Sequence, residues 1–484
     1  MFMDFLNAVD DFVWGVPLIV MILFTGIYLT VRLKGLQLVH LPKALKFMFQ
    51  NEEGGTGEVS SFAALCTALS ATIGTGNIVG VATAIVSGGP GALFWMWVAA
   101  FFGMATKYAE GLLAVRYRTI DEDGHALGGP FYYIEKGMGE KWKWLAKLFA
   151  FFGMCVGLFG IGTFTQANGI ISSINTVFDP NNVATVNLFG NEMSWSVIIG
   201  GIVLTILVAA VVLGGLKRIA RVSEIVVPFM AVAYILCALI IIITHITDVP
   251  AAFVEIVQSA FGMRAVAGGA LGAIIVAMQK GIARGIFSNE AGLGSAPIAA
   301  AAAQTKSCVR QGLVTMTGTF IDTIIVCTMT GLSIVITKSW NIGLEGVNVT
   351  INAFQKGLPF PEQFSAILLM ICLSFFAFTT ILGWDYYGER CLEYFSGRNQ
   401  KSVMIYRYLY ILAIFISPIM TLEAVWTIAD IFNALMALPN LIALLALSGV
   451  IVAETRDYFN GPTDSQGMLK GEHDVVSVNE MVGK

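Results

Sequence analysis

Two of the most apolar stretches of the chain are interrupted in the middle by glycine and polar residues. The first interruption covers residues 70–77, with the sequence SATIGTGN, and the second covers residues 285–292, with the sequence GIFSNEAG. Lipid provides no water for the amide and carbonyl groups that a broken helix releases, so such a break persists only where it is buried in protein or lines a cavity. One break in each half of a long membrane chain indicates a polar site between the two broken helices.

Composition indicates that these stretches lie in a membrane. Of the 484 residues, 56% are apolar and only 12% are charged, and the mean hydropathy is +0.77. A helix needs about 20 mostly apolar residues to cross the hydrocarbon core of a bilayer, and about eleven segments meet that requirement. We therefore expect an all-α integral membrane protein. The expected spans are 12–32, 61–87, 91–115, 145–177, 195–214, 222–244, 266–302, 311–337, 361–388, 403–422 and 425–453.

The distribution of Lys and Arg beside the spans predicts the orientation. Basic residues gather in the segments that follow the first and third spans, whereas the loop 178–194 contains no Lys or Arg. Because basic residues accumulate in cytoplasmic loops, we expect the N-terminus to lie outside and the C-terminus to lie in the cytoplasm. Lys338 and Lys356, in the expected external loop 338–360, run against this rule. The chain is expected to be a multi-pass protein of the cell membrane.

If the first span is an accessory helix, the other ten spans divide into two sets of five. Because five is odd, the second set enters the membrane from the opposite side, and the two halves are expected to have inverted topology. Each half then begins with one of the two broken helices. The expected organisation is an accessory helix and loop in 1–60, a first repeat in 61–245, a second repeat in 266–453 and a cytoplasmic tail in 454–484.

The first break is suited to bind a carboxylate. A half-helix that starts after Gly76 presents free amide hydrogens and the positive end of the helix dipole, and glycine permits close approach of a ligand to the backbone. We therefore predict that Thr75, Gly76 and Asn77 contact the carboxylate of a zwitterion. The alternative is that Gly74 and Gly76 only allow tight helix packing, as small residues often do in membranes.

The second break would supply the opposite pole of the same site. Carbonyls released around Ile286, Phe287 and Ser288, together with the side chains of Ser288 and Asn289, could accept hydrogen bonds from an ammonium group. Phe287 would form a wall of the side-chain pocket. A charge such as Glu290 is costly at this depth. It could bind the ammonium, carry a proton, pair with a basic neighbour such as Arg284, or cap the half-helix that follows, and we favour the structural roles.

Other charges and classes of function are constrained less strongly. Lys107 and Glu110 are three residues apart within one span, and we expect them to pair with each other or with neighbours. The net charge of −4 argues against a nucleic-acid partner. The sequence lacks a constellation of His, Cys or paired carboxylates that would indicate an enzyme. A channel would need a continuous polar pore, but the polar residues cluster at the breaks. An amino acid-sensing receptor, or an ion channel without coupled accumulation, remains the alternative to a carrier.

Two long motifs then resemble one known family. The run GGPGALFWMWVAAFFG at 88–103 and the run ARGIFSNEAGLGSAP at 283–297 are similar to the signatures of the alanine or glycine:cation symporters, also called sodium:alanine symporters. The resemblance implies the five-plus-five inverted-repeat fold of amino acid-polyamine-organocation-type transporters. It implies symport of a small neutral amino acid, alanine or glycine, with Na+ or H+, and no organic cofactor. The absence of a GxxxxGK[ST] motif fits a carrier driven by an ion gradient.

The resemblance also implies two further sets of contacts. It places the span 145–177 beside the substrate, with Gln166 as a lateral contact and Phe164 as packing. In similar transporters a pair of hydroxyls on the eighth core helix meets carbonyls just before the first break. Carried onto this sequence, that arrangement gives a sodium site of Ser70, Ile73, Thr379 and Thr380. For such residues a hydrogen bond within the membrane, to another helix or to their own backbone, is the structural alternative. The oligomeric state is not predicted.

Overall fold

The computed structural model describes residues 2–50, 52, 55–121, 124–188, 191–262, 269–420 and 422–461. Within this part of the chain, nine helices are long and apolar enough to cross a membrane, or ten if the bent pair Ser61–Thr72 and Gly76–Gly88 counts as one span. Pro17–Arg32 is a shorter apolar helix. These elements overlap the eleven predicted segments, so the predicted all-α membrane fold is confirmed.

The N-terminal region differs from the single predicted span. Instead of one helix, α1 (Phe2–Val13) and α2 (Val16–Arg32) are separated by a turn at Trp14 and Gly15. Two short helices follow, α3 (Leu36–Val39) and α4 (Leu41–Met48). Helix α2 packs against α7, and α1 packs against α21, so both N-terminal helices lie at the edge of the bundle that the two repeats form.

The first repeat contains the first broken helix and four further spans. Its helices are α5 (Ser61–Thr72), the π-helix η1 (Gly76–Gly80), α6 (Val81–Gly88), α7 (Gly91–Arg116), α8 (Pro130–Tyr132), η2 (Tyr133–Gly137), η3 (Glu140–Trp142), α9 (Lys143–Phe159), α10 (Phe164–Phe178), α11 (Trp195–Val212) and α12 (Leu216–Thr244). The predicted span 145–177 is therefore not continuous, because α9 ends before Gly160 and α10 begins at Phe164.

The second half of the chain also contains a broken helix that is followed by further spans. Its helices are α13 (Val249–Ala260), α14 (Ala270–Asn289), α15 (Ala296–Ala300), α16 (Cys308–Thr319), the π-helix η4 (Phe320–Cys327), α17 (Thr328–Ile336), η5 (Ser339–Asn341), α18 (Val347–Gly357), α19 (Glu362–Ser396), α20 (Gln400–Ile416), η6 (Ser417–Ile419), α21 (Leu422–Ala446) and α22 (Ser448–Asn460). Helix α22 extends into the predicted tail 454–484, of which residues 462–484 lie outside the described part of the chain.

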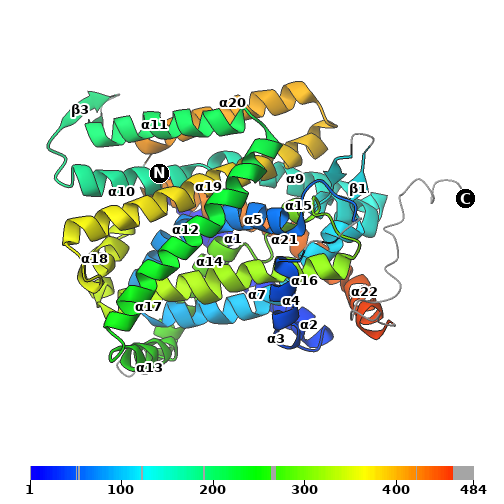
Figure 1. The fold of residues 1–484 in the computed structure, drawn as a ribbon, viewed down its shortest axis with the longest axis horizontal. Helices are drawn as coiled ribbons and strands as arrows, with labels where there is room; N and C mark the ends of the chain where they lie inside the picture. Colours follow the sequence, from blue (N-terminus) through cyan, green and yellow to red (C-terminus); the bar gives the residue numbers. More distant parts are fainter. Residues whose placement is uncertain are drawn as a thin grey trace, which may run out of the picture.

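Two short antiparallel hairpins complete the structure. Strands β1 (Thr119–Ile120) and β2 (Ala126–Leu127) pair after α7, and strands β3 (Thr185–Leu188) and β4 (Asn191–Ser194) pair between α10 and α11. Figure 1 shows these two hairpins on opposite sides of the helical bundle, with β3 at the left and β1 at the right. They belong to the predicted loops and not to the spans.

The broken helices lie in the interior of the bundle. In Figure 1, α5 lies near the middle of the molecule, and the long helix α12 crosses in front of it. Helix α5 packs against α12 and α19, whereas α7 packs against both α14 and α16. Close packing of α7 on α16 depends on Gly111, because a Cβ atom at this position would lie 2.4 Å from Thr315 Oγ1. Small residues at such contacts are typical of helices that associate in membranes.

Candidate functional site

The first break lies where the sequence predicts it. Helix α5 ends at Thr72, η1 begins at Gly76, and the two halves of the span meet at an angle of 51°. The residues around the break are buried, Ile73 and Thr75 completely. The chain resumes as a π-helix, a form that is rare and often found at functional sites. The break is therefore an interior feature of the bundle and not a kink facing lipid.

Two side chains bind the amide groups that the first break releases. The Gly74 amide donates to Asn77 Oδ1 at 2.8 Å, and the Thr75 amide donates to Gln166 Oε1 at 3.0 Å. In a continuous helix these two amides would bond to the carbonyls of Ser70 and Ala71. Both carbonyls therefore lose their helical donors at the break, which makes them available to another donor or to a cation.

The second break begins later than predicted. Helix α14 continues through residues 285–289 and ends at Asn289, and the non-helical segment runs from Glu290 to Ser295. The Ile286 carbonyl still accepts a helical hydrogen bond from the Glu290 amide, at 2.8 Å. The predicted release of this carbonyl is therefore wrong, whereas the helix end does lie at Phe287, Ser288 and Asn289. The predicted start of the break was too early because polar residues in the last turn of a helix resemble those of a break.

Buried carboxylates hold the second break in place. Glu290 has left-handed backbone angles, with φ of 57°. It accepts hydrogen bonds from Trp384 Nε1, at 2.8 Å, and from the Ser295 hydroxyl at the start of α15. From α7, Glu110 accepts the amides of Gly292 and Gly294, each at 3.1 Å. Glu290 thus takes the structural role that we favoured, bridging the two ends of the break.

Glu290 does not pair with Arg284, which was one of the alternatives that the sequence left open. Arg284 instead forms two hydrogen bonds to Asp430 on α21, at 3.0 and 2.8 Å. Its guanidinium lies 4.6 Å from the centre of the Trp426 ring, and that ring packs against Phe287 with 4.7 Å between ring centres. Phe287 is completely buried. The ion pair and the two rings therefore pack together on the α14 side of the breaks.

Asp322 joins the two breaks. It lies in the π-helix η4 and is completely buried. Its Oδ1 accepts from Asn77 Nδ2 at 2.7 Å, and its Oδ2 accepts from Ser288 Oγ at 2.9 Å and from Thr323 Oγ1 at 2.7 Å. Asn289 extends the network by donating to Thr323 Oγ1 at 3.0 Å. One carboxylate therefore receives donors from both broken helices.

Our sequence reasoning missed Asp322, although a signal was present. A carboxylate inside an apolar span is expensive and indicates function by default, and Asp322 is the only charged residue in the predicted span 311–337. The sequence does not indicate that Asn77 and Ser288 turn toward it. Gly76 makes that meeting possible, because a Cβ atom there would lie 3.0 Å from the Ser288 Cα.

Part of the predicted sodium site comes together. Thr380 Oγ1 lies 3.2 Å from the Ile73 carbonyl, so α19 contacts the first break directly. Thr379 Oγ1 bonds to the carbonyls of Phe375 and Phe376 and lies 3.4 Å from Met230 Sδ on α12. The Ser70 hydroxyl donates to the Thr67 carbonyl at 2.7 Å. The described contacts thus join Thr380 to Ile73 and engage the other two hydroxyls with their own helices.

Gln166 and Phe164 lie beside the interruption between α9 and α10. Gln166 Nε2 donates to the Ile161 carbonyl at 3.0 Å while its Oε1 accepts the Thr75 amide. The Phe164 ring packs 6.0 Å from the Phe159 ring, and the Phe164 carbonyl accepts from Ser417. Gln166 therefore connects the first break to a third interrupted span, which the sequence did not indicate.

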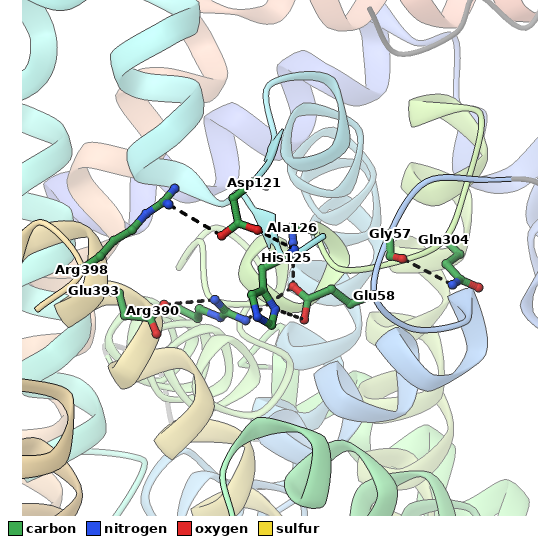
Figure 2. A network of polar contacts seen from close by, with 9 residues as sticks. All are labelled: Gly57, Glu58, Asp121, His125, Ala126, Gln304, Arg390, Glu393 and Arg398. Carbon is green, nitrogen blue, oxygen red and sulfur yellow. Dashed lines mark hydrogen bonds and ion pairs between the residues drawn. The ribbon is translucent and has the colours of Figure 1, made fainter. Parts of the chain in front are cut away.

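A second polar network surrounds Glu58, which precedes α5. Figure 2 shows Glu58 between the β1–β2 hairpin and the end of α19. Its carboxylate accepts the Ala126 amide at 2.6 Å and lies 3.2 Å from His125 Nδ1 and 3.5 Å from Arg390. Arg390 also pairs with Glu393, and Arg398 pairs with Asp121. We call this set of residues the Glu58 network.

The same end also ties the two broken helices to each other. Thr56 and Val59 form bridges with Thr305 and Ala303, the residues that follow α15. Arg118 supports this contact by donating to the carbonyls of Thr56, Ala301 and Ala303 at 2.6–2.8 Å. Burial lowers the pKa of Arg118 to about 10, so its guanidinium remains charged at neutral pH.

Comparisons with known proteins agree with this architecture. A sequence model of the sodium:alanine symporter family matches residues 1–470. The chain is 48% identical over 465 residues to the sodium/alanine symporter AgcS of Methanococcus maripaludis, covering 94% of this chain and 97% of that protein. It is 37% identical over 453 residues to the probable sodium/glutamine symporter GlnT of Bacillus subtilis, covering 93% and 89%.

The fold resembles that of a solved transporter structure. The crystal structure of MhsT in complex with L-phenylalanine matches with a TM-score of 0.54 at 13% sequence identity, covering 83% of this chain and 99% of that chain. At this low identity the similarity concerns the fold alone. The fold is the leucine-transporter-like inverted-repeat fold, as the count of spans predicts.

Proposed function

The chain belongs to the sodium:alanine symporter family, and on that basis we propose that it takes up a small neutral amino acid, alanine or glycine, together with Na+ by alternating access. The observation that carries the proposal is the convergence of both broken helices on Asp322 through Asn77 and Ser288. Broken helices at membrane depth, joined by one buried carboxylate, form a polar site in which a zwitterion can replace its hydration.

The substrate carboxylate binds at the first break in this proposal. Thr75 Oγ1 is buried and has no hydrogen-bond partner among the described residues, so its hydroxyl is available to an incoming acceptor. The amide oxygens of Gln166 and Asn77 occupy the acceptor positions of the Thr75 and Gly74 amides. A carboxylate is the stronger acceptor and would take over at least one of these amides, with Gly76 allowing its approach.

The substrate ammonium binds on the opposite side, near Asp322. Ser288 and Asn289 are held close to this carboxylate, either directly or through Thr323. An ammonium group that reaches Asp322 forms a charge-assisted hydrogen bond, which is about twice as strong as a neutral one. Phe287 and Phe164 supply apolar surface, and a substrate with a short side chain fits a site this closely packed. The greater similarity to a sodium/alanine symporter than to a probable glutamine symporter supports the same choice.

Sodium binds where α19 meets the first break. Na+ needs several oxygen ligands without fixed direction, and Thr380, Thr379 and the carbonyls of Ile73 and Ser70 are oxygens on the two facing elements. The Ser70 carbonyl has lost its helical donor, since the Gly74 amide bonds to Asn77. Because Na+ and substrate both contact the first break, each favours the same arrangement of one element, and their binding is thermodynamically coupled.

The two closed ends of the bundle provide the gates. The Arg284–Asp430 pair with Trp426 and Phe287 closes the outside, and the Glu58 network closes the cytoplasmic side. This assignment follows the orientation predicted from Lys and Arg, with the N-terminus outside. Movement of the core bundle would break one closure while the other persists, so the site would open to one side at a time.

Uptake in proteoliposomes tests the proposal. We expect an inward Na+ gradient to drive saturable accumulation of labelled alanine, and K+ in place of Na+ to abolish it. Counterflow against internal unlabelled alanine, glycine, serine and glutamine would rank the substrates. Flux that does not saturate would favour a channel, and binding without accumulation would favour a sensor. Uptake that follows an imposed proton gradient without Na+ would replace Na+ by H+ as the coupling ion.

A further inference from the structure

Lys107 is a buried cation that the proposed mechanism does not use. It lies on α7 and its side chain is only 2% exposed. The predicted pairing with Glu110 is not present, because Lys107 Nζ has no hydrogen-bond partner among the described residues. An unpaired ammonium is costly in a low-dielectric interior. Something other than a direct contact must therefore stabilise it.

The side chain lines a small cavity at the ends of both breaks. The cavity has room for roughly one water molecule. Its wall includes Thr72, the last residue of α5, and Asn289, the last residue of α14, together with Ala296 at the start of α15 and Thr315 on α16. Lys107 therefore reaches the two elements that form the proposed transport site.

Three buried carboxylates surround this region, and neutral groups supply their hydrogen bonds. Glu110 accepts two backbone amides and the Asn440 amide, Glu290 accepts from Trp384 and Ser295, and Asp322 accepts from Asn77, Ser288 and Thr323. The geometry places all three near Lys107. Glu110 lies one turn further along α7, and Glu290 follows Asn289, which lies in the cavity wall. Asp322 accepts from Thr323, which itself accepts from Asn289. Their combined field stabilises the ammonium, and the same field attracts any other cation that enters the site.

We propose that Lys107 is a built-in cation of the transport site, whose charge offsets the field of Glu110, Glu290 and Asp322 and thereby weakens the binding of Na+. This inference rests on the proposed sodium-coupled transport. A chain with a neutral residue at this position holds Na+ more tightly and releases it more slowly to the cytoplasm. Lys107 thus sets the Na+ concentration at which the carrier works.

The test compares Lys107→Met, which keeps the length of the side chain but removes its charge, with Lys107→Arg, which keeps the charge. In proteoliposomes, we expect the Na+ concentration for half-maximal alanine uptake to fall by about tenfold in Lys107→Met, as the loss of one charge within a protein interior implies, and to stay unchanged in Lys107→Arg. Lys147→Met, at an exposed position on α9, is the matched control for the change in net charge. An unchanged or higher value in Lys107→Met would overturn the inference.

A second variant and a binding measurement test the inference even if Lys107→Met does not transport alanine. Neutralising a carboxylate, in Glu110→Gln, should raise the half-saturating Na+ concentration, and an unchanged value would also contradict the inference. For a variant that folds but does not transport, the Na+ dependence of thermal unfolding in detergent reports the same affinity, and a midpoint equal to that of wild type rejects the role of Lys107. Absence of Na+-dependent uptake in the wild type would instead overturn the proposed function itself.

Discussion

The two broken helices are built from different chemistry. At the first break, the released groups bond to neutral side chains, namely Gln166, Asn77 and Thr380. At the second break, the loop is held by the carboxylates of Glu290 and Glu110. A break with neutral partners can exchange them for an anionic group, whereas a break held by carboxylates favours cations. This difference gives a zwitterion one preferred orientation between the breaks.

We expect Asp322→Asn to reduce alanine transport the most. The change removes a charge that both broken helices contact through hydrogen bonds, since Asn77 and Ser288 both donate to it. A hydrogen bond to a charged group contributes about 1.5–3 kcal/mol, so we expect alanine uptake at low substrate concentration to fall by roughly 100-fold. Initial rates in proteoliposomes measure this effect.

The control for that experiment is Asp457→Asn, at an exposed position on α22. It changes the net charge in the same way and should leave uptake unchanged. If Asp322→Asn transports alanine with wild-type affinity, then the ammonium does not bind at this carboxylate, and the difference between the breaks does not orient the substrate.

Thr380→Val and Thr379→Val sharpen the description of the first break. Valine has the shape of threonine without the hydroxyl, so each variant removes one oxygen. Thr380 reaches the Ile73 carbonyl, whereas Thr379 contacts its own helix and Met230. Loss of one ligand costs about 1–2 kcal/mol. We therefore expect the half-saturating Na+ concentration to rise about tenfold in Thr380→Val and less in Thr379→Val. Unchanged Na+ dependence in both variants would remove the ion site from this position.

Gln166→Leu tests the neutral partners of the first break with a smaller expected effect. The variant removes both the acceptor of the Thr75 amide and the donor to the Ile161 carbonyl. The substrate would also lose its lateral contact with Gln166, so we expect the KM for alanine to rise about fivefold, which corresponds to about 1 kcal/mol. The Na+ dependence should change little. A KM equal to that of wild type would show that Gln166 has only a structural role.

The sequence alone predicts the architecture and the existence of both breaks. It does not predict which residues contact the breaks. The number of spans and the first break follow from hydropathy and glycine placement, because lipid enforces regular helices elsewhere. The second break is displaced by a few residues, since Gly285 and Ser288 fit within a helix that ends at Asn289. The contacts of Asp322, Glu110 and Gln166 join segments far apart in sequence, and only the packing of the bundle brings them together.

The two ends of the bundle also differ in their contacts. In the proposed mechanism one ion pair, Arg284–Asp430, closes the α14 side. At the other end, the segment before α5 is bridged to the segment after α15 and held by the Glu58 network. Where several weak contacts form a closure, the removal of one contact changes the free energy of the closure little. Glu58→Gln keeps an acceptor for the Ala126 amide but loses the charge opposite Arg390.

We therefore expect Glu58→Gln to shift the carrier toward its cytoplasm-open form by only about 1 kcal/mol, the scale of a partly exposed ion pair. Labelling of a single cysteine introduced at Thr72, which lines the cavity on that side, should become two- to fivefold faster. Arg284→Met, which removes the ion pair at the opposite end, should slow the same labelling reaction or leave it unchanged, since it favours opening to the other side. Equal acceleration in both variants would mean that the two ends are not alternative gates, because opening one end would not require closure of the other.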